Sequence, residues 1–234
     1  MTTELAPDLP EPIDVIALSV QVGAGGYGIA RAVAEKLRFR YYDWEVTSRA
    51  ITEIGISFDS LRATGVDLSL SDRVMSRLAL ANLFEDEVPP AMVAGSFRMS
   101  TASVAALSVT PCRLFIEDVV RDLAATGEAV IVGHGSSVIL REKPSALRVF
   151  IRASLMTRAK RMVAETGCSL TEAVTALDQS DDLKGDYLRN AYGIDWLDPS
   201  NYDVVVSTDK LTSDGAAEAI VAAARVRNAS LIAV

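Results

Sequence analysis

Cysteine and histidine are scarce in this 234-residue chain, which has two cysteines and one histidine. So few cysteines exclude a disulfide framework, and Cys112 and Cys168 show no metal-ligand spacing. No apolar run approaches the roughly 18 to 20 residues that a membrane-spanning helix needs. Residues 1–12 carry acids and prolines instead of the basic and apolar segments of a signal peptide. We therefore expect a flexible N-terminal tail on a cytoplasmic protein that has no membrane partner.

Positively charged residues are also fewer than negatively charged ones: the chain has 23 Lys and Arg residues and 31 Asp and Glu residues, for a net charge of −8. A nucleic-acid-binding protein usually presents an electropositive face, so we expect no nucleic-acid partner. A nucleotide or another phosphorylated small molecule needs only a local cluster of cations and amides. Half of the residues are hydrophobic, which is enough for one core, and we expect a single domain over residues 13–234. The oligomeric state is not indicated.

The strongest local pattern is a strand that runs into a glycine-rich turn and then into a helix. Residues 15–20 are apolar and β-branched, as in a buried strand, and from Ile29 the apolar residues recur at helical spacing. This layout wraps backbone N–H groups around a phosphate. The residues that we expect to bind the phosphate groups are Gly23, Ala24, Gly25, Gly26, Tyr27 and Gly28.

Two known motifs fit this turn in part. The glycines within Gly23–Gly28 match the dinucleotide motif G-x-G-x-x-G, and Asp43 supplies an acid about 20 residues further on. They also match the glycine spacing of the kinase loop G-x-x-x-x-G-K-[ST], but Ile29 and Ala30 replace the Lys and the hydroxyl. A shifted alignment puts Gly26 in place of the Lys. A turn that only packs a strand against a helix is the third possibility.

Strands and helices alternate along the rest of the chain. The helices that we expect cover residues 26–37, 44–54, 112–125, 136–141, 154–166, 169–177 and 214–225. The strands that we expect cover residues 15–20, 39–42, 129–132, 147–151 and 203–206. The apolar side of the helix over 112–125 is predicted to hold Leu114, Phe115, Val119 and Leu123. This alternation predicts an α/β fold with a parallel sheet of about five strands wrapped by helices.

Several polar or glycine-rich segments directly follow the expected strands. Parallel sheets bind ligands at the carboxyl ends of their strands. The segments are the glycine turn, Asp43, Gly133-His134 and Ser207-Thr208. We therefore expect them to share one crevice, with residues 57–110 as a mobile insertion above it.

With these residues placed, the chain resembles the cytidylate kinase-like family, a branch of the P-loop nucleoside monophosphate kinases. The string from Gly193 to Asp203 is the most specific match. The other matching segments are Gly23–Gly26 with Ile29-Ala30, Tyr41-Tyr42-Asp43, Val130–Gly133, and Ala153 with Arg158 and Arg161. The family also commonly lacks the loop lysine. The resemblance implies a P-loop kinase-like sheet with a helical acceptor-binding insertion over 57–110 and a lid region over 153–200.

The resemblance further implies an enzyme that transfers the γ-phosphoryl group of ATP, in the presence of Mg²⁺, to a nucleoside monophosphate or a similar small acceptor. Arg158, Arg161 and Asp181 match catalytic positions of the lid, where arginines neutralise the transferring phosphoryl group. A solvated basic face is the plain alternative for the two arginines. No residue is assigned to a metal. Ser207, Thr208 and Lys210 fall in the loop that holds adenine, mostly through its backbone.

On the acceptor side, Asp43 and Arg49 match residues that contact the monophosphate. The plain alternatives are a helix N-cap for Asp43 and a solvated helix residue for Arg49. His134 stands where the family has an arginine, and it either contacts a phosphate or hydrogen-bonds the sheet edge.

The cations of the family pattern are depleted in this chain. The turn has no lysine, His134 replaces an arginine, and the lid motif Asp-Lys-x-Arg appears as Asp181-Asp182-Leu183-Lys184. One lost donor costs on the order of 3 kcal/mol of transition-state stabilisation. The alternative function is therefore a catalytically impaired kinase-like protein that binds a nucleotide or an anion and acts in regulation.

Overall fold

The computed structural model describes residues 12–43 and 111–229. The expectations for the N-terminal tail, the helix over 44–54, Arg49 and the insertion over 57–110 lie outside these residues. The elements in chain order are β1 (Val15–Val20), α1 (Gly26–Leu37), β2 (Arg40–Tyr42), α7 (Pro111–Ala125), β3 (Ala129–Val132), α8 (Ser136–Ile139), β4 (Ala146–Arg152), α9 (Leu155–Thr166), α10 (Leu170–Tyr192), a 3-10 turn (Pro199–Asn201), β5 (Val204–Ser207) and α11 (Ser213–Ala229).

The described strands form one parallel sheet in the order β2-β3-β1-β4-β5. β1 lies at its centre, with Val15 opposite Ala129 of β3 and opposite Ala146 of β4. Every residue of β1 is buried, as expected for a parallel strand covered on both faces. The predicted fold class is confirmed.

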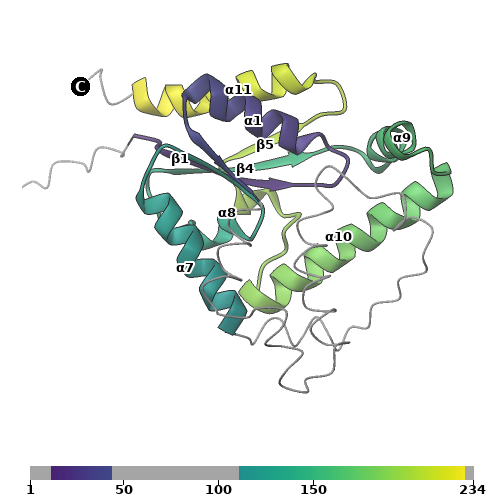
Figure 1. Cartoon of the computed structure of the whole chain (residues 1–234), viewed down its shortest axis with the longest axis horizontal. Helices are drawn as coiled ribbons and strands as arrows, with labels where there is room; N and C mark the ends of the chain where they lie inside the picture. Colours follow the sequence, from purple (N-terminus) through teal and green to yellow (C-terminus); the bar gives the residue numbers. More distant parts are fainter. Residues whose placement is uncertain (1–11, 44–110, 230–234) are drawn as a thin grey trace, which may run out of the picture.

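Helices cover both faces of the sheet (Figure 1). Successive side chains of a strand point to opposite faces. Ile16 and Leu18 therefore pack in the core shared with α1 and α11, whereas Val15 and Ala17 pack in the core shared with α7. β1 is thus fixed from both sides, and the loop that follows it starts from a rigid point.

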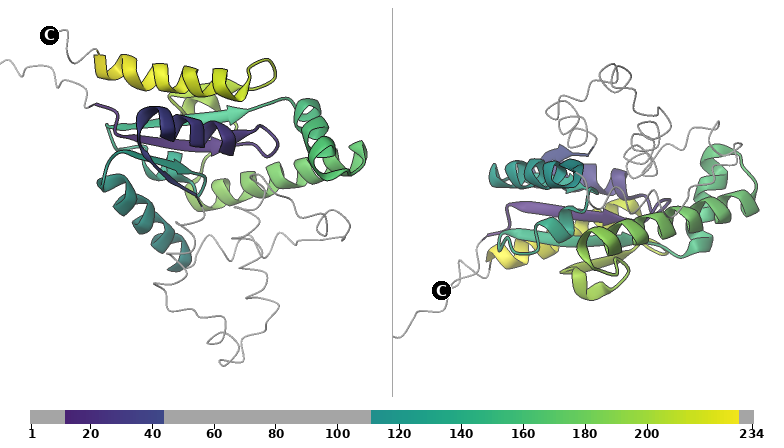
Figure 2. Two further views of the ribbon diagram at one scale, coloured as in Figure 1. Left: turned by 45° about the horizontal axis from the view of Figure 1, so that its top comes forward. Right: turned by 90° about the horizontal axis from the view of Figure 1, so that it is seen from below.

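Helix α9 lies beyond the carboxyl ends of the strands, and α10 runs from there back along the sheet, where its Leu188 packs with Phe150 of β4 (Figure 2). Ser154 and Ser169 cap their N-termini, and Ser169 forms a full capping box with Glu172. The two helices share a small apolar core of Ala159, Met162, Ala173 and Leu177. Their polar faces are consequently placed beside the turn that follows β1. In the described part of the chain, no helix has the length and apolarity to cross a membrane.

Two expectations about the helices were wrong. α10 does not end at Leu177 but continues to Tyr192, so the motif Asp181–Lys184 lies within a helix. Its small and polar buried positions, Ser180 and Gly185, hide the helical period from an apolar pattern. On α7, Leu114 is 57% exposed, whereas Ile116 and Val120 are buried. The core side of α7 is therefore rotated away from Leu114, although Val119 and Leu123 are buried as predicted.

Candidate active site

The carboxyl ends of the parallel strands bring the predicted segments to one edge of the sheet. The glycine turn follows β1, Asp43 follows β2, His134 lies just after β3, and Thr208 follows β5. The same edge faces α9 and α10 (Figure 2). This is the edge at which open parallel sheets bind their ligands.

The glycine turn has a backbone that suits an anion. Gly23 and Gly25 have φ values of 73° and 75°, in the left-handed region that glycine adopts most easily. Gly25 is also the N-cap of α1, and no described side chain caps this end. The N-terminus of this 12-residue helix and its positive dipole therefore face the turn.

Close packing explains two of the glycines. A Cβ at Gly23 would lie 3.1 Å from Cβ and from O of Arg158, and a Cβ at Gly26 would overlap both methyl groups of Val20. The turn is thus pressed between α9 and β1. A Cβ at Gly28 would meet nothing within 4 Å.

This pattern disfavours the dinucleotide alternative. The third glycine of that motif serves close helix–strand packing, which Gly28 does not provide here. The dinucleotide fold also places its second strand beside the first. In this sheet β3 lies between β1 and β2, so Asp43 is one strand further from the glycine turn than the motif requires.

Arg158 joins the two helices of the expected lid. Its side chain is only 4% exposed, and its guanidinium donates to both carboxylate oxygens of Asp181, at 2.7 and 3.2 Å. It also donates to the carbonyl of Val22, at 3.4 Å. Burial raises the pKa of Asp181, and the neighbouring Arg158 opposes this shift. Arg158 is therefore not part of a solvated basic face.

Arg161 fastens the glycine turn to the loop after β5. Its guanidinium donates to the carbonyl of Gly23 at 3.2 Å, and to Oγ1 and O of Thr208 at 2.9 and 2.7 Å. Thr208 is buried, and its hydroxyl donates to the carbonyl of Ala24 at 2.9 Å. Both predicted arginines therefore lie against the turn, while Lys160 of the same helix is exposed.

The loop after β5 also touches the start of α9 through Asp209, which sequence reasoning missed. Asp209 accepts bonds from the amide and the hydroxyl of Ser154, at 2.9 and 2.7 Å, and from the hydroxyl of Ser207 at 3.0 Å. Hydrogen bonds from Thr157 and Ser154 hold the pKa of Asp209 well below its ordinary value. Ser207 and Lys210 are exposed, so both remain accessible to a ligand.

On the acceptor side, His134 contacts the backbone of Asp43. Its Nε2 lies 2.8 Å from the Asp43 carbonyl, and because a carbonyl only accepts, Nε2 carries the proton. Burial lowers the pKa of His134 to about 4, so the ring is neutral at pH 7. It does not supply the charge of the arginine that the family has at this position.

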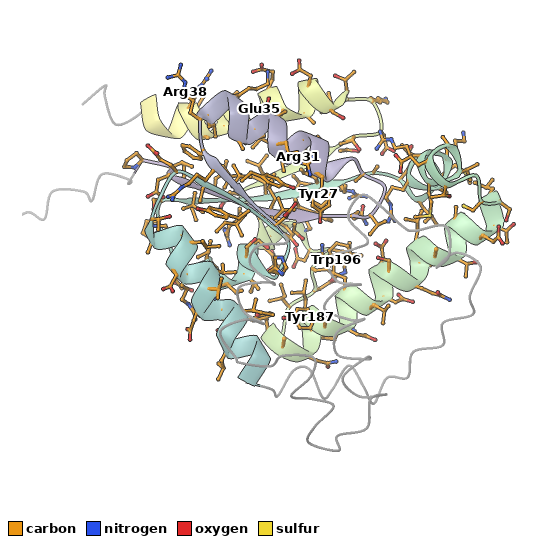
Figure 3. The ribbon with its side chains drawn as sticks, viewed as in Figure 1. Tyr27, Arg31, Glu35, Arg38, Tyr187 and Trp196 are labelled. Carbon is orange, nitrogen blue, oxygen red and sulfur yellow. The ribbon has the colours of Figure 1, made fainter. Side chains whose placement is uncertain are left out.

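Sequence reasoning also missed the placement of Lys184. Its Nζ donates to the carbonyl of Val20, the last residue of β1, at 2.7 Å. The same ammonium lies 4.6 Å from the centroid of the Trp196 ring, and Figure 3 shows Trp196 between α10 and the sheet. Lys184 and Val20 are 164 positions apart in the chain, so no local pattern signals this contact. Within the described residues, no group of three His, Cys, Asp or Glu side chains forms a metal site.

Comparison with known proteins gives matches over most of the described chain. A family model described as the cytidylate kinase-like family matches residues 15–210. The chain is 30% identical over 101 residues to a cytidylate kinase of Pyrobaculum aerophilum, which is 43% of this chain and 54% of that protein. It is 33% identical over 95 residues to a cytidylate kinase of Thermococcus kodakarensis, which is 41% of this chain and 49% of that protein. The matches thus span about half the length of these relatives.

Two solved structures are similar in fold. A protein of Eubacterium ventriosum has a TM-score of 0.61 at 19% identity, over 92% of this chain and 99% of that one. A protein of Thermus thermophilus has a TM-score of 0.51 at 15% identity, over 92% of this chain and 98% of that one. At such identities these likenesses concern the fold alone.

Proposed function

We propose that this chain, which belongs to the cytidylate kinase-like family, is a nucleotide-binding phosphotransferase. Its reaction is the transfer of the γ-phosphoryl group of ATP to a nucleoside monophosphate or a similar small acceptor. The observation that carries this proposal is that Arg158 and Arg161 of α9 lie against the carbonyls of Val22 and Gly23. Two guanidinium groups at a glycine turn suit a polyphosphate, because their forked N–H groups match phosphate oxygens.

The residues present fit ATP better than they fit an isolated metal ion. The left-handed glycines and the uncapped start of α1 offer backbone N–H groups to phosphates. Mg²⁺ is commonly bound through substrate phosphates, and the described residues hold no acidic cluster for it. We assign the ion to the nucleotide, where it neutralises phosphate charge. The loop of Ser207, Thr208 and Lys210 is our candidate for the adenine.

The arginines have different tasks in this proposal. Arg161 donates to a hydroxyl and two carbonyls, acceptors that phosphate oxygens can replace with stronger, charge-assisted bonds. Arg158 is buried against Asp181, so Asp181 acts as the residue that positions it. Asp43 and Arg49 complete the proposal as contacts of the acceptor. Neutral His134 holds the backbone of Asp43 in place.

The experiment is a nucleotide-binding and turnover assay on the purified full chain. ATP with Mg²⁺ should raise the melting temperature, because a ligand that binds only the folded state stabilises it. ADP release should appear with one member of a panel of nucleoside monophosphates, with cytidine monophosphate tested first because the curated relatives are cytidylate kinases. Arg161→Met should lower kcat about a hundredfold. Arg189→Met is the matched control, because Arg189 is exposed and its guanidinium pairs with Asp186 of the same helix.

Two outcomes count against the proposal. ATP binding without turnover of any acceptor would favour the regulatory, catalytically impaired alternative. A chain that binds no nucleotide at all would contradict the proposed function, and the alternative would then survive only if the chain binds another anion.

A further inference from the structure

Thr208 uses its polar atoms for contacts within the protein. The residue is 2% exposed. Its amide donates to the carbonyl of Arg152 at 2.8 Å, and its hydroxyl donates to the carbonyl of Ala24 at 2.9 Å. The hydroxyl and the carbonyl of Thr208 also accept bonds from the Arg161 guanidinium, at 2.9 and 2.7 Å. Both donors of Thr208 are therefore engaged, although the residue lies in the loop that we expect to hold adenine.

The hydroxyl of Thr208 joins Arg161 to the glycine turn. A threonine hydroxyl has one proton to donate and two lone pairs that accept. The proton is given to Ala24, because the other acceptor within reach, the carbonyl of Arg152, is more distant at 3.4 Å. A lone pair accepts the bond from Nη1 of Arg161. A methyl group at this position could make neither contact.

A second contact fixes the loop of Thr208 relative to α9. Asp209 accepts bonds from the amide and the hydroxyl of Ser154, at 2.9 and 2.7 Å. Ser154 is the N-cap of α9, and Arg161 lies about two helical turns further along. The loop is thus bound to the start and to the middle of the same helix. Thr208 consequently has a fixed position from which its hydroxyl can orient the guanidinium.

Arg161 keeps donors for a ligand while it contacts Thr208. An arginine side chain has five N–H donors. In the described part of the chain, its contacts with Gly23 and Thr208 use three of them, and the side chain is partly exposed. A phosphate can therefore accept two bonds from Arg161 without displacing the hydroxyl of Thr208.

We infer that Thr208 is a positioning residue, whose hydroxyl holds the Arg161 guanidinium in place for a phosphate group of the nucleotide. A free arginine side chain has many rotamers, and ordering it when a ligand binds would cost affinity. A guanidinium that is already ordered avoids that cost. This inference rests on the proposed function, since it concerns the same polyphosphate. It gives the hydroxyl of Thr208 a task other than contact with adenine.

The test compares Thr208→Val, which removes the hydroxyl and keeps the branched shape, with Thr208→Ser, which keeps the hydroxyl. Calorimetry would measure the binding of inorganic tripolyphosphate and of adenosine. We expect Thr208→Val to weaken tripolyphosphate about fivefold, which is the usual effect of one hydrogen bond. Its affinity for adenosine should not change, and Thr208→Ser should keep most of the affinity for tripolyphosphate.

The control Thr175→Val makes the same substitution at an exposed position of α10. The hydroxyl of Thr175 donates to the carbonyl of Thr171 in the same helix, at 2.9 Å. This variant should bind both ligands as the unaltered chain does.

A double-mutant cycle separates positioning from a structural role. If the hydroxyl acts through Arg161, Thr208→Val should cause no further loss of tripolyphosphate affinity in the Arg161→Met background, because no guanidinium is left to hold. Equal losses in both backgrounds would contradict the inference. They would mean that the hydroxyl supports the fold of the site in general.

A second measurement leaves Thr208 in place, in case Thr208→Val does not fold. In ¹⁵N relaxation experiments on the unaltered chain, the Nε–H signal of Arg161 is identified by its absence from Arg161→Met. Without ligand, its order parameter should already match those of the backbone of α9. A lower value that rises only when tripolyphosphate is added would contradict the inference, because the ligand would then order the guanidinium.

The failures of the two proposals can be told apart. If the unaltered chain binds neither ATP nor tripolyphosphate, the proposed function fails. If it binds both, and Thr208→Val binds tripolyphosphate equally well or more tightly, the inference alone fails; tighter binding would mean that the phosphate displaces the hydroxyl. The inference also fails if Thr208→Val weakens adenosine as much as tripolyphosphate, or if Thr208→Ser is as weak as Thr208→Val.

Discussion

Single residues in left-handed conformations direct the loops of the site. Gly133, His134 and Gly135 follow one another with φ values of 73°, 55° and 71°. Only the middle residue has a side chain, and a side chain in this region is uncommon outside Asn, Asp and His. The tight turn aims the His134 ring at the carbonyl of Asp43. The histidine thereby connects the ends of β3 and β2.

The pH dependence of stability should report on this contact. The pKa of His134 is lowered from 6.5 to about 4 in the folded chain, so between these values the unfolded chain binds more protons. The stabilisation is therefore complete above pH 6.5 and is lost as pH falls toward 4, by up to about 3 kcal/mol. Urea unfolding at several pH values should show a shallower decline for His134→Asn, which tolerates the positive φ. Parallel curves for the two proteins would contradict this assignment.

At the scale of single residues, the sequence predicted the type of site but not the contacts that each site residue makes. The run of glycines indicated a phosphate-binding turn, because glycine permits left-handed backbone and close approach. A side chain is excluded at Gly26 because Val20 fills the space, whereas the space at Gly28 is open. No local sequence pattern specifies this difference. Lys184 was a weakened match to a lid motif, and its contact with β1 depends on how α10 packs.

Among the elements, α9 and α10 are joined by a charged pair between their facing sides. The side chains of Arg158 and Asp181 are 4% and 19% exposed. Arg189 and Asp186 form a second pair, within α10, whose side chains are 63% and 40% exposed. The two pairs therefore offer the same chemistry in two environments.

A double-mutant cycle should separate these environments. Arg158→Met or Asp181→Asn alone should destabilise the chain by about 3 to 5 kcal/mol, because each leaves a buried partner without its counter-charge. The double variant should recover a large part of this loss. The cycle on Arg189 and Asp186 should give a coupling near zero. Additive losses at Arg158 and Asp181 in urea unfolding would mean that the pair does not join the helices.

Elements with strong local signals were predicted well. Residues 26–37 form α1 and residues 129–132 form β3, as expected, because a glycine turn or an apolar run marks their limits. The end of α10 was wrong because its buried Ser180 and Gly185 break the apolar period. Leu114 was placed on the wrong side of α7, since a periodic pattern does not say which flank the sheet covers.

For the whole molecule, alternation of strands and helices was sufficient to predict a parallel sheet with its ligand edge at the strand ends. The alternation did not predict the order of the strands, because the position of β3 between β1 and β2 depends on contacts between segments far apart in the sequence. That order decides against the dinucleotide alternative. The architecture therefore carried functional information that the glycine motif lacked.

The proposed site predicts a specific footprint on this architecture. Short-time hydrogen exchange with and without ATP and Mg²⁺ should show protection in residues 21–30 and in the loop after β5. Helix α7 packs on the face of β1 opposite α1 and should exchange as before, because local openings there do not involve the ligand. Protection confined to α7 would place the nucleotide elsewhere.

Val20 couples the glycine turn to α10. Its methyl groups occupy the space that a side chain at Gly26 would need, and its carbonyl holds Lys184. A side chain at residue 26 would need a smaller residue at position 20, and that substitution alone would open a gap in the core. A side chain at residue 26 is therefore tolerated only together with a smaller residue at position 20.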